Sequence, residues 1–237
     1  AQRITPFAVE DAARPEESST TASEEEKALP RVLLDTRLNN RIIDLRTATN
    51  QAIFRIQSGI CNLFREFFLE NRFVEIHSPK LISAASEGGS NVFKVSYFKT
   101  EAYLAQSPQF YKQMAICGDL ERVFEIAPVF RAENSFTHRH MTEFVGVDLE
   151  MAFKQHYHEV MLLIGRMFMF IFSELPRRFA AEIAVVRKQY PIEEFKLPAG
   201  GNFPVVQYPE AIALLREAGV EIGDFDDLST EVERHLG

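Results

Sequence analysis

The sequence predicts an α+β fold in which helices flank an antiparallel sheet. Apolar residues recur every three or four positions over residues 46–70 and again over residues 156–183, which is the spacing of helices that bury one face. Between these segments, residues 122–133 and 141–153 are rich in Phe and Val and are joined by a polar loop, which predicts a long antiparallel hairpin. Helices therefore precede and follow the sheet along the chain.

Size and composition exclude several classes of protein. The chain has 237 residues, of which 46% are hydrophobic, enough for a substantial core. Two cysteines exclude a disulfide scaffold and fit a reducing compartment, and no run of about 18 apolar residues could span a membrane. The net charge of −8 argues against binding nucleic acid through bulk charge. We expect neither a membrane nor DNA as a partner.

The first 34 residues differ from the rest of the chain. Over residues 9–30, seven acidic residues stand against two basic ones, and bulky apolar residues are nearly absent. Such a segment buries too little apolar surface to offset the entropy lost on ordering. We interpret residues 9–34 as a flexible acidic linker, residues 1–8 as the end of an upstream domain, and residues 35–237 as the folded domain.

The elements between the first long helix and the hairpin are short. Asn71 is expected to end the helix as its C-cap. A polar loop with two glycines is expected at residues 83–91, and Pro108 suits the first position of another helix. The short strands expected here are, in order, residues 73–76, 92–98 and 101–106.

The segment after the second long helix is expected to be mostly helical. A turn with Pro and Gly at residues 198–204 leads to a helix over residues 209–218. Thr230 and Glu233 have the spacing of a capping box, which opens a last helix.

The loop of the hairpin carries the strongest chemical signal. Residues 130–144 hold two Arg, two His and two Glu, and charges beside a sheet are costly unless they meet a ligand or one another. Arg131 ends an apolar strand, where its planar guanidinium can fork onto a phosphate. Taken alone, the pattern also fits an ion-paired surface hairpin. Alternation along the return strand puts His140, Thr142 and Phe144 on one face and Met141 and Glu143 on the other.

This loop resembles the second signature motif of the class II aminoacyl-tRNA synthetases, a strand ending in Phe-Arg-x-Glu, a variable loop and a return strand with an acidic residue and Phe. Residues 72–79, Arg-Phe-Val-Glu-Ile-His-Ser-Pro, resemble the first motif, whose proline lies at the dimer interface. Residues 86–93 and 106–113 are similar to the flipping loop and the amino-acid pocket of the aspartate-specific members. The resemblance covers residues 35–153, and four motifs in order are more specific than one.

The resemblance implies ATP-dependent activation of L-aspartate to aspartyl-adenylate and transfer of the aspartyl group to tRNA(Asp), by a cytoplasmic homodimer that uses ATP and Mg²⁺. Arg131 would be the catalytic residue and hold the α-phosphate. Asp148 and Glu150 would line the aspartate or magnesium side, and no metal ligand is assigned. The other ATP-binding residues implied are Glu133, His140, Glu143 and Phe144, the last stacking on adenine. The aspartate-binding residues implied are Glu87, Ser107, Gln109 and Lys112.

Lys112 favours aspartate as the amino acid. An aspartate side chain needs a buried cation, and Lys112 supplies one about a helical turn after Pro108. A site for asparagine has no use for a fixed ammonium, and a site for lysine needs the opposite charge. Glu87, in a loop with two glycines, would close over the ammonium group of the substrate. An asparaginyl-tRNA synthetase is the alternative within this family.

The third motif of the family, a Gly-rich strand and helix with an essential Arg, has no match. The only double glycine after the second motif, Gly200-Gly201, is followed by Asn-Phe-Pro and does not fit. The catalytic domain over residues 35–237 is therefore expected to be incomplete and inactive alone, and residues 1–8 would end an anticodon-binding domain. A synthetase-like interaction protein that has lost catalysis is a second hypothesis.

The first long helix and the strand after it predict a homodimer. In class II synthetases these segments pack against their own copies across a two-fold axis. Pro79 cannot donate a hydrogen bond to a neighbouring strand and suits the end of such an interface. We expect an area of roughly 2,000 Å² or more. Alternatively, the apolar stripe of the helix packs only on the sheet of its own domain.

Overall fold

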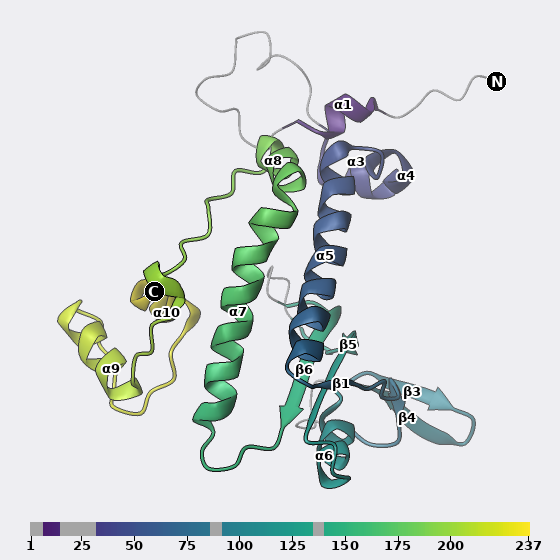
Figure 1. The fold of residues 1–237 in the computed structure, drawn as a ribbon. Coiled ribbons are helices and arrows are strands. Elements are labelled where there is room, and N and C mark those ends of the chain that lie inside the picture. The colour runs from purple at the N-terminus through teal and green to yellow at the C-terminus, as the bar shows by residue number, and fades with distance from the viewer. Residues whose placement is uncertain (1–6, 15–31, 86–91, 135–139) are drawn as a thin grey trace. The chain divides into compact units, whose positions relative to one another are not determined.

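The computed structural model describes residues 7–14, 32–85, 92–134 and 140–237 (Figure 1). They belong to two compact units, Ala1–Phe195 and Lys196–Gly237. The predicted loop centre at 135–139 and much of the predicted linker and glycine-bearing loop, at 15–31 and 86–91, lie outside the described residues. Within the described residues, no helix is long and apolar enough to cross a membrane.

Two long helices form the frame of the first unit (Figure 1). Helix α5 (Ala48–Glu70) begins after Thr47, whose hydroxyl accepts a hydrogen bond from the amide of Asn50 at 3.3 Å. It ends at Asn71, as predicted, and the side-chain amide of Asn71 donates to the Phe67 carbonyl at 2.8 Å. Helix α7 (His158–Arg178) packs against α5.

The predicted hairpin is the centre of the main sheet. Strands β5 (Arg122–Phe130) and β6 (Glu143–Met151) pair antiparallel over nine registered positions. Strand β1 (Val74–Glu75) adds to the other edge of β5, but in parallel, so this sheet is not wholly antiparallel. Parallel pairing arises because β1 and β5 are joined by a long crossover rather than by a tight turn.

A second, smaller sheet lies between β1 and β5 in the sequence. Its order is β2-β4-β3 and all its pairs are antiparallel. Strands β3 and β4 confirm the two strands expected here, whereas β2 was not expected. The bounds are Leu81–Ile82 for β2, Lys94–Tyr97 for β3 and Thr100–Leu104 for β4.

The core lies between the long helices and one face of the main sheet. Phe68 of α5 is fully buried and stacks on Phe124 of β5 with ring centroids 4.6 Å apart. Full burial of such a side chain contributes about 1.5–3 kcal/mol. The same cluster contains Leu63 from α5 and Leu163 and Met167 from α7. Around Phe124 this face of β5 and β6 is therefore taken up by packing, and the opposite face is free there for chemistry.

Helix α7 is shorter than the single helix predicted over residues 156–183. The chain leaves helical geometry at Phe179 and continues as α8 (Ala180–Gln189). Pro176 lies in the last turn of α7, where it removes a donor and crowds the preceding carbonyl. The ring of Phe179 covers Gly59 of α5, where an added Cβ would lie 2.1 Å from the ring. The close approach of α5 to α8 therefore requires glycine.

Within the described residues, three short helices precede α5. They are α1 (Val9–Ala12), α3 (Leu34–Asn39) and α4 (Arg41–Asp44). Asp44 is fully buried and is bound by the guanidinium groups of Arg37 and Arg41. The side-chain amide of Asn50 also donates to the backbone carbonyl and the carboxylate of Asp44, so the start of α5 is tied to the preceding helices.

The second unit contains a 3-10 turn and two helices. They are η1 (Ala199–Gly201), α9 (Tyr208–Glu217) and α10 (Thr230–Leu236). Helix α10 begins at Thr230, but its N-cap is Ser229, whose hydroxyl accepts from the amide of Val232 at 3.3 Å. The predicted Thr230 cap was therefore wrong by one residue, because Ser229 offers the same hydroxyl in extended geometry.

Candidate active site

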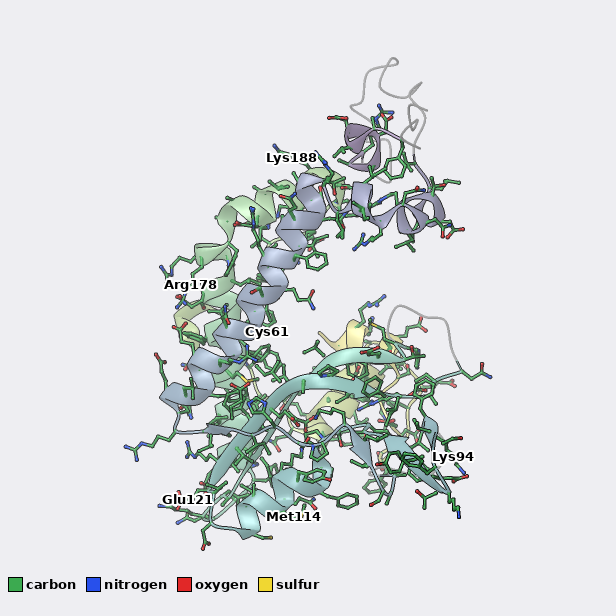
Figure 2. All side chains as sticks on the ribbon, turned by 90° about the vertical axis from the view of Figure 1, so that its right-hand side faces the viewer. Cys61, Lys94, Met114, Glu121, Arg178 and Lys188 are labelled. Atoms are coloured by element: carbon green, nitrogen blue, oxygen red, sulfur yellow. The ribbon has the colours of Figure 1, made fainter. Side chains whose placement is uncertain are left out.

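The free face of the β5–β6 hairpin is polar. Glu125 and Asp148 are registered partners across the two strands, so their side chains share one face. Glu150, two residues after Asp148, lies on the same face, and helix α6 (Gln109–Cys117) packs on both strands. Figure 2 shows α6, marked by Met114, beside the hairpin. Apolar packing on one face and carboxylates on the other define the candidate site.

Lys112 of α6 is buried against these carboxylates. Its Nζ donates to Asp148 Oδ1 at 2.6 Å and lies 3.4 Å from Glu150 Oε2, and only 9% of the residue is exposed. The Nζ also lies 3.4 Å from the Leu149 carbonyl. The structure thus brings together the predicted pocket lysine and the two return-strand carboxylates.

The residues before Lys112 form a tightly packed entry to α6. Pro108 is the N-cap of α6 rather than its first residue, and Gln109 is half-buried in the first turn. Ser107 is 7% exposed, and its Oγ is buried without a hydrogen-bond partner among the described residues. A buried hydroxyl without a partner is costly, so Ser107 Oγ is a natural contact for a ligand.

Arg131 stands at the end of β5, where the predicted phosphate-binding group belongs. It is exposed, and its guanidinium carbon lies 5.5 Å from the centre of the half-buried Phe144 ring. The Arg131 amide donates to the Thr142 carbonyl at 3.0 Å, which fixes the backbone on both sides of the loop. Arg131 and Phe144 together present a cation and an aromatic face, the surfaces that a phosphate and a planar base need.

The other predicted nucleotide contacts are less closely grouped. Glu133 is half-buried beyond the end of β5, and its amide donates to the Arg131 carbonyl at 2.9 Å. His140 is exposed and precedes β6, so strand alternation does not extend to it. Glu143 is the registered partner of Phe130 and lies on the face opposite to Phe144. Glu87 lies outside the described residues.

Glu125 is a site residue that the sequence reasoning missed. It is 3% exposed in the middle of β5 and accepts hydrogen bonds from the amide and hydroxyl of Ser78, both at 2.7 Å, and from Lys80 Nζ at 2.9 Å. The signal was a single carboxylate within the apolar run 122–130, because a buried charge in a strand needs dedicated partners.

The described residues offer no group of three or more His, Cys, Asp or Glu side chains that could hold a metal ion. The carboxylates nearest the site are engaged by lysines, Asp148 and Glu150 by Lys112 and Glu125 by Lys80. The side chains described here do not provide a ready magnesium site.

The comparisons with known proteins agree with this geometry. The family model for tRNA synthetases class II (D, K and N) matches residues 34–236. The chain is 60% identical over 234 residues to the cytoplasmic aspartate–tRNA ligase of Homo sapiens and 60% identical over 233 residues to that of Caenorhabditis elegans. The matches cover 98% of this chain, but 45% and 44% of these relatives. The chain thus spans less than half the length of the curated relatives it matches.

Solved structures give the same result. An aspartyl tRNA synthetase from Entamoeba histolytica matches with a TM-score of 0.82 and 48% identity, over 100% of this chain and 46% of that chain. An asparaginyl-tRNA synthetase from Pyrococcus horikoshii, complexed with asparaginyl-adenylate, matches with a TM-score of 0.73 and 31% identity, over 86% of this chain and 46% of that one.

Proposed function

Because the chain belongs to the class II tRNA synthetases of the D, K and N group, we propose that its protein activates L-aspartate with ATP and transfers the aspartyl group to tRNA(Asp). The observation that carries the proposal is the 60% identity to cytoplasmic aspartate–tRNA ligases over 98% of the chain. We propose a cytoplasmic location on the same ground.

The proposed chemistry joins the α-carboxylate of aspartate to the α-phosphorus of ATP. A carboxylate oxygen forms a bond to phosphorus, the bond from that phosphorus to the bridging oxygen breaks, and pyrophosphate leaves. Arg131 would hold the α-phosphate, because its guanidinium, which lies over the Phe144 ring, has several N–H donors that can fork onto phosphate oxygens. Phe144 would stack on the adenine ring. Glu133, His140 and Glu143 are proposed as further nucleotide contacts.

The aspartate side would be built on α6. Lys112 would bind the side-chain carboxylate of the substrate, and the unpartnered Ser107 hydroxyl and the half-buried Gln109 would complete the contacts. Asp148 and Glu150 hold Lys112 in the pocket, which fixes the position of its ammonium. Glu87 is proposed to close over the ammonium group of the substrate.

A magnesium ion would offset charge on the phosphates of ATP. The described residues do not supply a group of three or more side chains that could hold it.

We extend the proposal to domains and assembly. Residues 35–237 would be part of the catalytic domain, residues 9–34 a linker and residues 1–8 the end of an anticodon-binding domain. Leu63, Phe68 and other buried residues of α5 pack within the domain, so part of the apolar face of this helix is already covered. Phe54 and Leu69 remain 53% and 58% exposed, and Pro79 is exposed as well. We propose that this exposed part is the homodimer interface.

Arg131→Ala in the full-length native protein tests the site. Removing the phosphate contact should abolish aspartate-dependent exchange between ATP and pyrophosphate, a loss of about 10²-fold or more. Arg166→Ala, an exposed position on α7, is the matched control and should leave exchange unchanged. Near-native exchange by Arg131→Ala would refute the assignment. If the native protein itself shows no synthetase activity, an interaction protein that has lost catalysis is favoured instead.

A further inference from the structure

We propose that Glu125 is a positioning residue that fixes the aspartate side and the phosphate side of the site relative to each other, an inference that rests on the proposed function. Glu125 itself contacts neither Arg131 nor Lys112 through any hydrogen bond that the structure describes. It acts through the turn at residues 78–80.

The Glu125 carboxylate is fully committed to that turn. Oε1 accepts from the Ser78 amide at 2.7 Å, and Oε2 accepts from the Ser78 hydroxyl at 2.7 Å and from Lys80 Nζ at 2.9 Å. Lys80 Nζ also donates to the Ser78 hydroxyl at 2.9 Å, which closes a ring of hydrogen bonds. With 3% of Glu125 exposed, little water competes for these contacts, so the ring holds the turn in one conformation.

Backbone hydrogen bonds connect the turn at residues 78–80 to both halves of the site. The Lys80 carbonyl accepts from the Ala105 amide at 2.9 Å, and the Ala105 carbonyl accepts from the Phe130 amide at 2.9 Å. Ala105 is followed by Gln106 and Ser107 at the start of α6, whereas Phe130 is followed by Arg131. A shift of the turn would therefore move Ala105, which precedes the aspartate contacts, and Phe130, which precedes Arg131, at the same time.

The charge arrangement explains why this position needs its own lysine. Glu125 and Asp148 face each other across the hairpin, and two carboxylates directly opposite repel. Lys80 neutralises Glu125, and Lys112 binds Asp148. Because Lys80 is paired with Glu125, Lys112 stays beside Asp148 and is not drawn toward Glu125. An apolar side chain would fit the surrounding strand at a lower desolvation cost, which points to a role beyond packing.

Glu125→Gln in the full-length native protein is the primary test. Active sites are counted from the adenylate formed in a single turnover, and KM for aspartate and for ATP is measured by pyrophosphate exchange. Because small misplacements of reacting groups have large effects, we expect KM for aspartate to rise about tenfold with the number of active sites per protein unchanged. Glu121→Gln, an exposed glutamate at the far end of the hairpin in Figure 2, should behave as native.

A role in folding alone predicts the opposite pattern. Fewer active sites, each with native KM values for aspartate and ATP, would overturn the proposal. If Glu125→Gln does not fold, Ser78→Ala decides, since it removes the hydroxyl contacts with Glu125 and Lys80 but keeps the backbone amide contact. A rise in KM for aspartate of about threefold supports the proposal, and native KM values overturn it. Absence of aspartate-dependent exchange in the native protein would instead refute the proposed function.

Discussion

Lys112 combines burial with a full set of partners, which determines how the site can discriminate among amino acids. Its ammonium is already paired with Asp148 and Glu150, so its position is fixed before any substrate arrives. An incoming aspartate carboxylate would share this ammonium with Asp148. The pocket would therefore select a negatively charged substrate side chain through Lys112, which Asp148 and Glu150 hold in place.

Lys112→Met should weaken activation of aspartate selectively. A hydrogen bond to a charged group contributes about 1.5–3 kcal/mol, which corresponds to a rise in KM for aspartate of about 10- to 150-fold. The loss should be larger for aspartate than for asparagine, because Asp148 and Glu150 would then repel the substrate carboxylate. Pyrophosphate exchange with each amino acid measures the difference, and equal losses for both would contradict the charge argument. Lys188→Met, on the exposed surface of α8 in Figure 2, is the control.

Asp44 makes the stability of the first unit depend on acid. Burial raises the pKa of Asp44, but the hydrogen bonds from Arg37 and Arg41 lower it by more than burial raises it. The net pKa of Asp44 therefore lies below its usual 3.8. A carboxylate with a lowered pKa stabilises the fold above its unfolded pKa and loses this effect as the pH falls through the folded value. The contribution is therefore complete at neutral pH and lost progressively below about pH 3.8.

Asp44→Asn should lower the free energy of unfolding at pH 7 by about 3–5 kcal/mol, because it leaves two guanidinium groups without their carboxylate. Chemical unfolding of native protein and variant at pH 7 and at pH 3 measures this, and the gap between them should shrink at pH 3. Asp35→Asn, at an exposed position of α3, should change stability little. An equal gap at both pH values would count against the ion pairs.

The sequence predicted some site residues better than others, for a physical reason. Arg131 and Phe144 were predicted because a motif with a defined order marks them, and they meet in the structure. Glu125 was missed because its role depends on Ser78 and Lys80, which lie more than 40 positions away in the chain. Pairing over such a distance is set by the parallel contact of β1 with β5, which no local pattern encodes.

At the scale of elements, Gly59 controls how closely α5 and α8 approach. Gly59→Val should lower the free energy of unfolding by about 1–3 kcal/mol, since the new side chain would overlap the Phe179 ring. Thermal and chemical unfolding of the native protein and the variant measure the change. Ser58→Val, an exposed neighbour on the same helix, controls for helix propensity. Equal stability of the two variants would mean that Phe179 moves away freely.

Prediction of the elements succeeded where periodicity is long and failed where tertiary contacts decide. Helix α5 and the β5–β6 hairpin have repeated apolar positions, and both were predicted close to their observed bounds. The break between α7 and α8 was missed, because the apolar pattern continues past Phe179 while the backbone turns there to cover Gly59. Strand β2 exists only through its pairing with β4, so its two residues carry no signal of their own.

At the scale of the whole molecule, the exposed apolar side chains of α5 predict assembly. We expect a homodimer in sedimentation of the full-length protein at micromolar concentration, because Phe54 and Leu69 leave apolar surface exposed on α5. Leu69→Lys should shift the equilibrium toward monomer. Leu162→Lys, 44% exposed on α7, should not. A single monomeric species in the native protein would defeat the prediction.

The central claim is that the protein activates aspartate, and amino-acid-dependent exchange of pyrophosphate into ATP by the full-length native protein tests it most directly. Aspartate, asparagine and lysine are compared at equal concentration, since these are the three amino acids named for the family. The ammonium of Lys112 predicts exchange with aspartate at least about 10²-fold faster than with asparagine, and none with lysine. Exchange that is faster with asparagine or lysine, or absent with all three, would contradict the account.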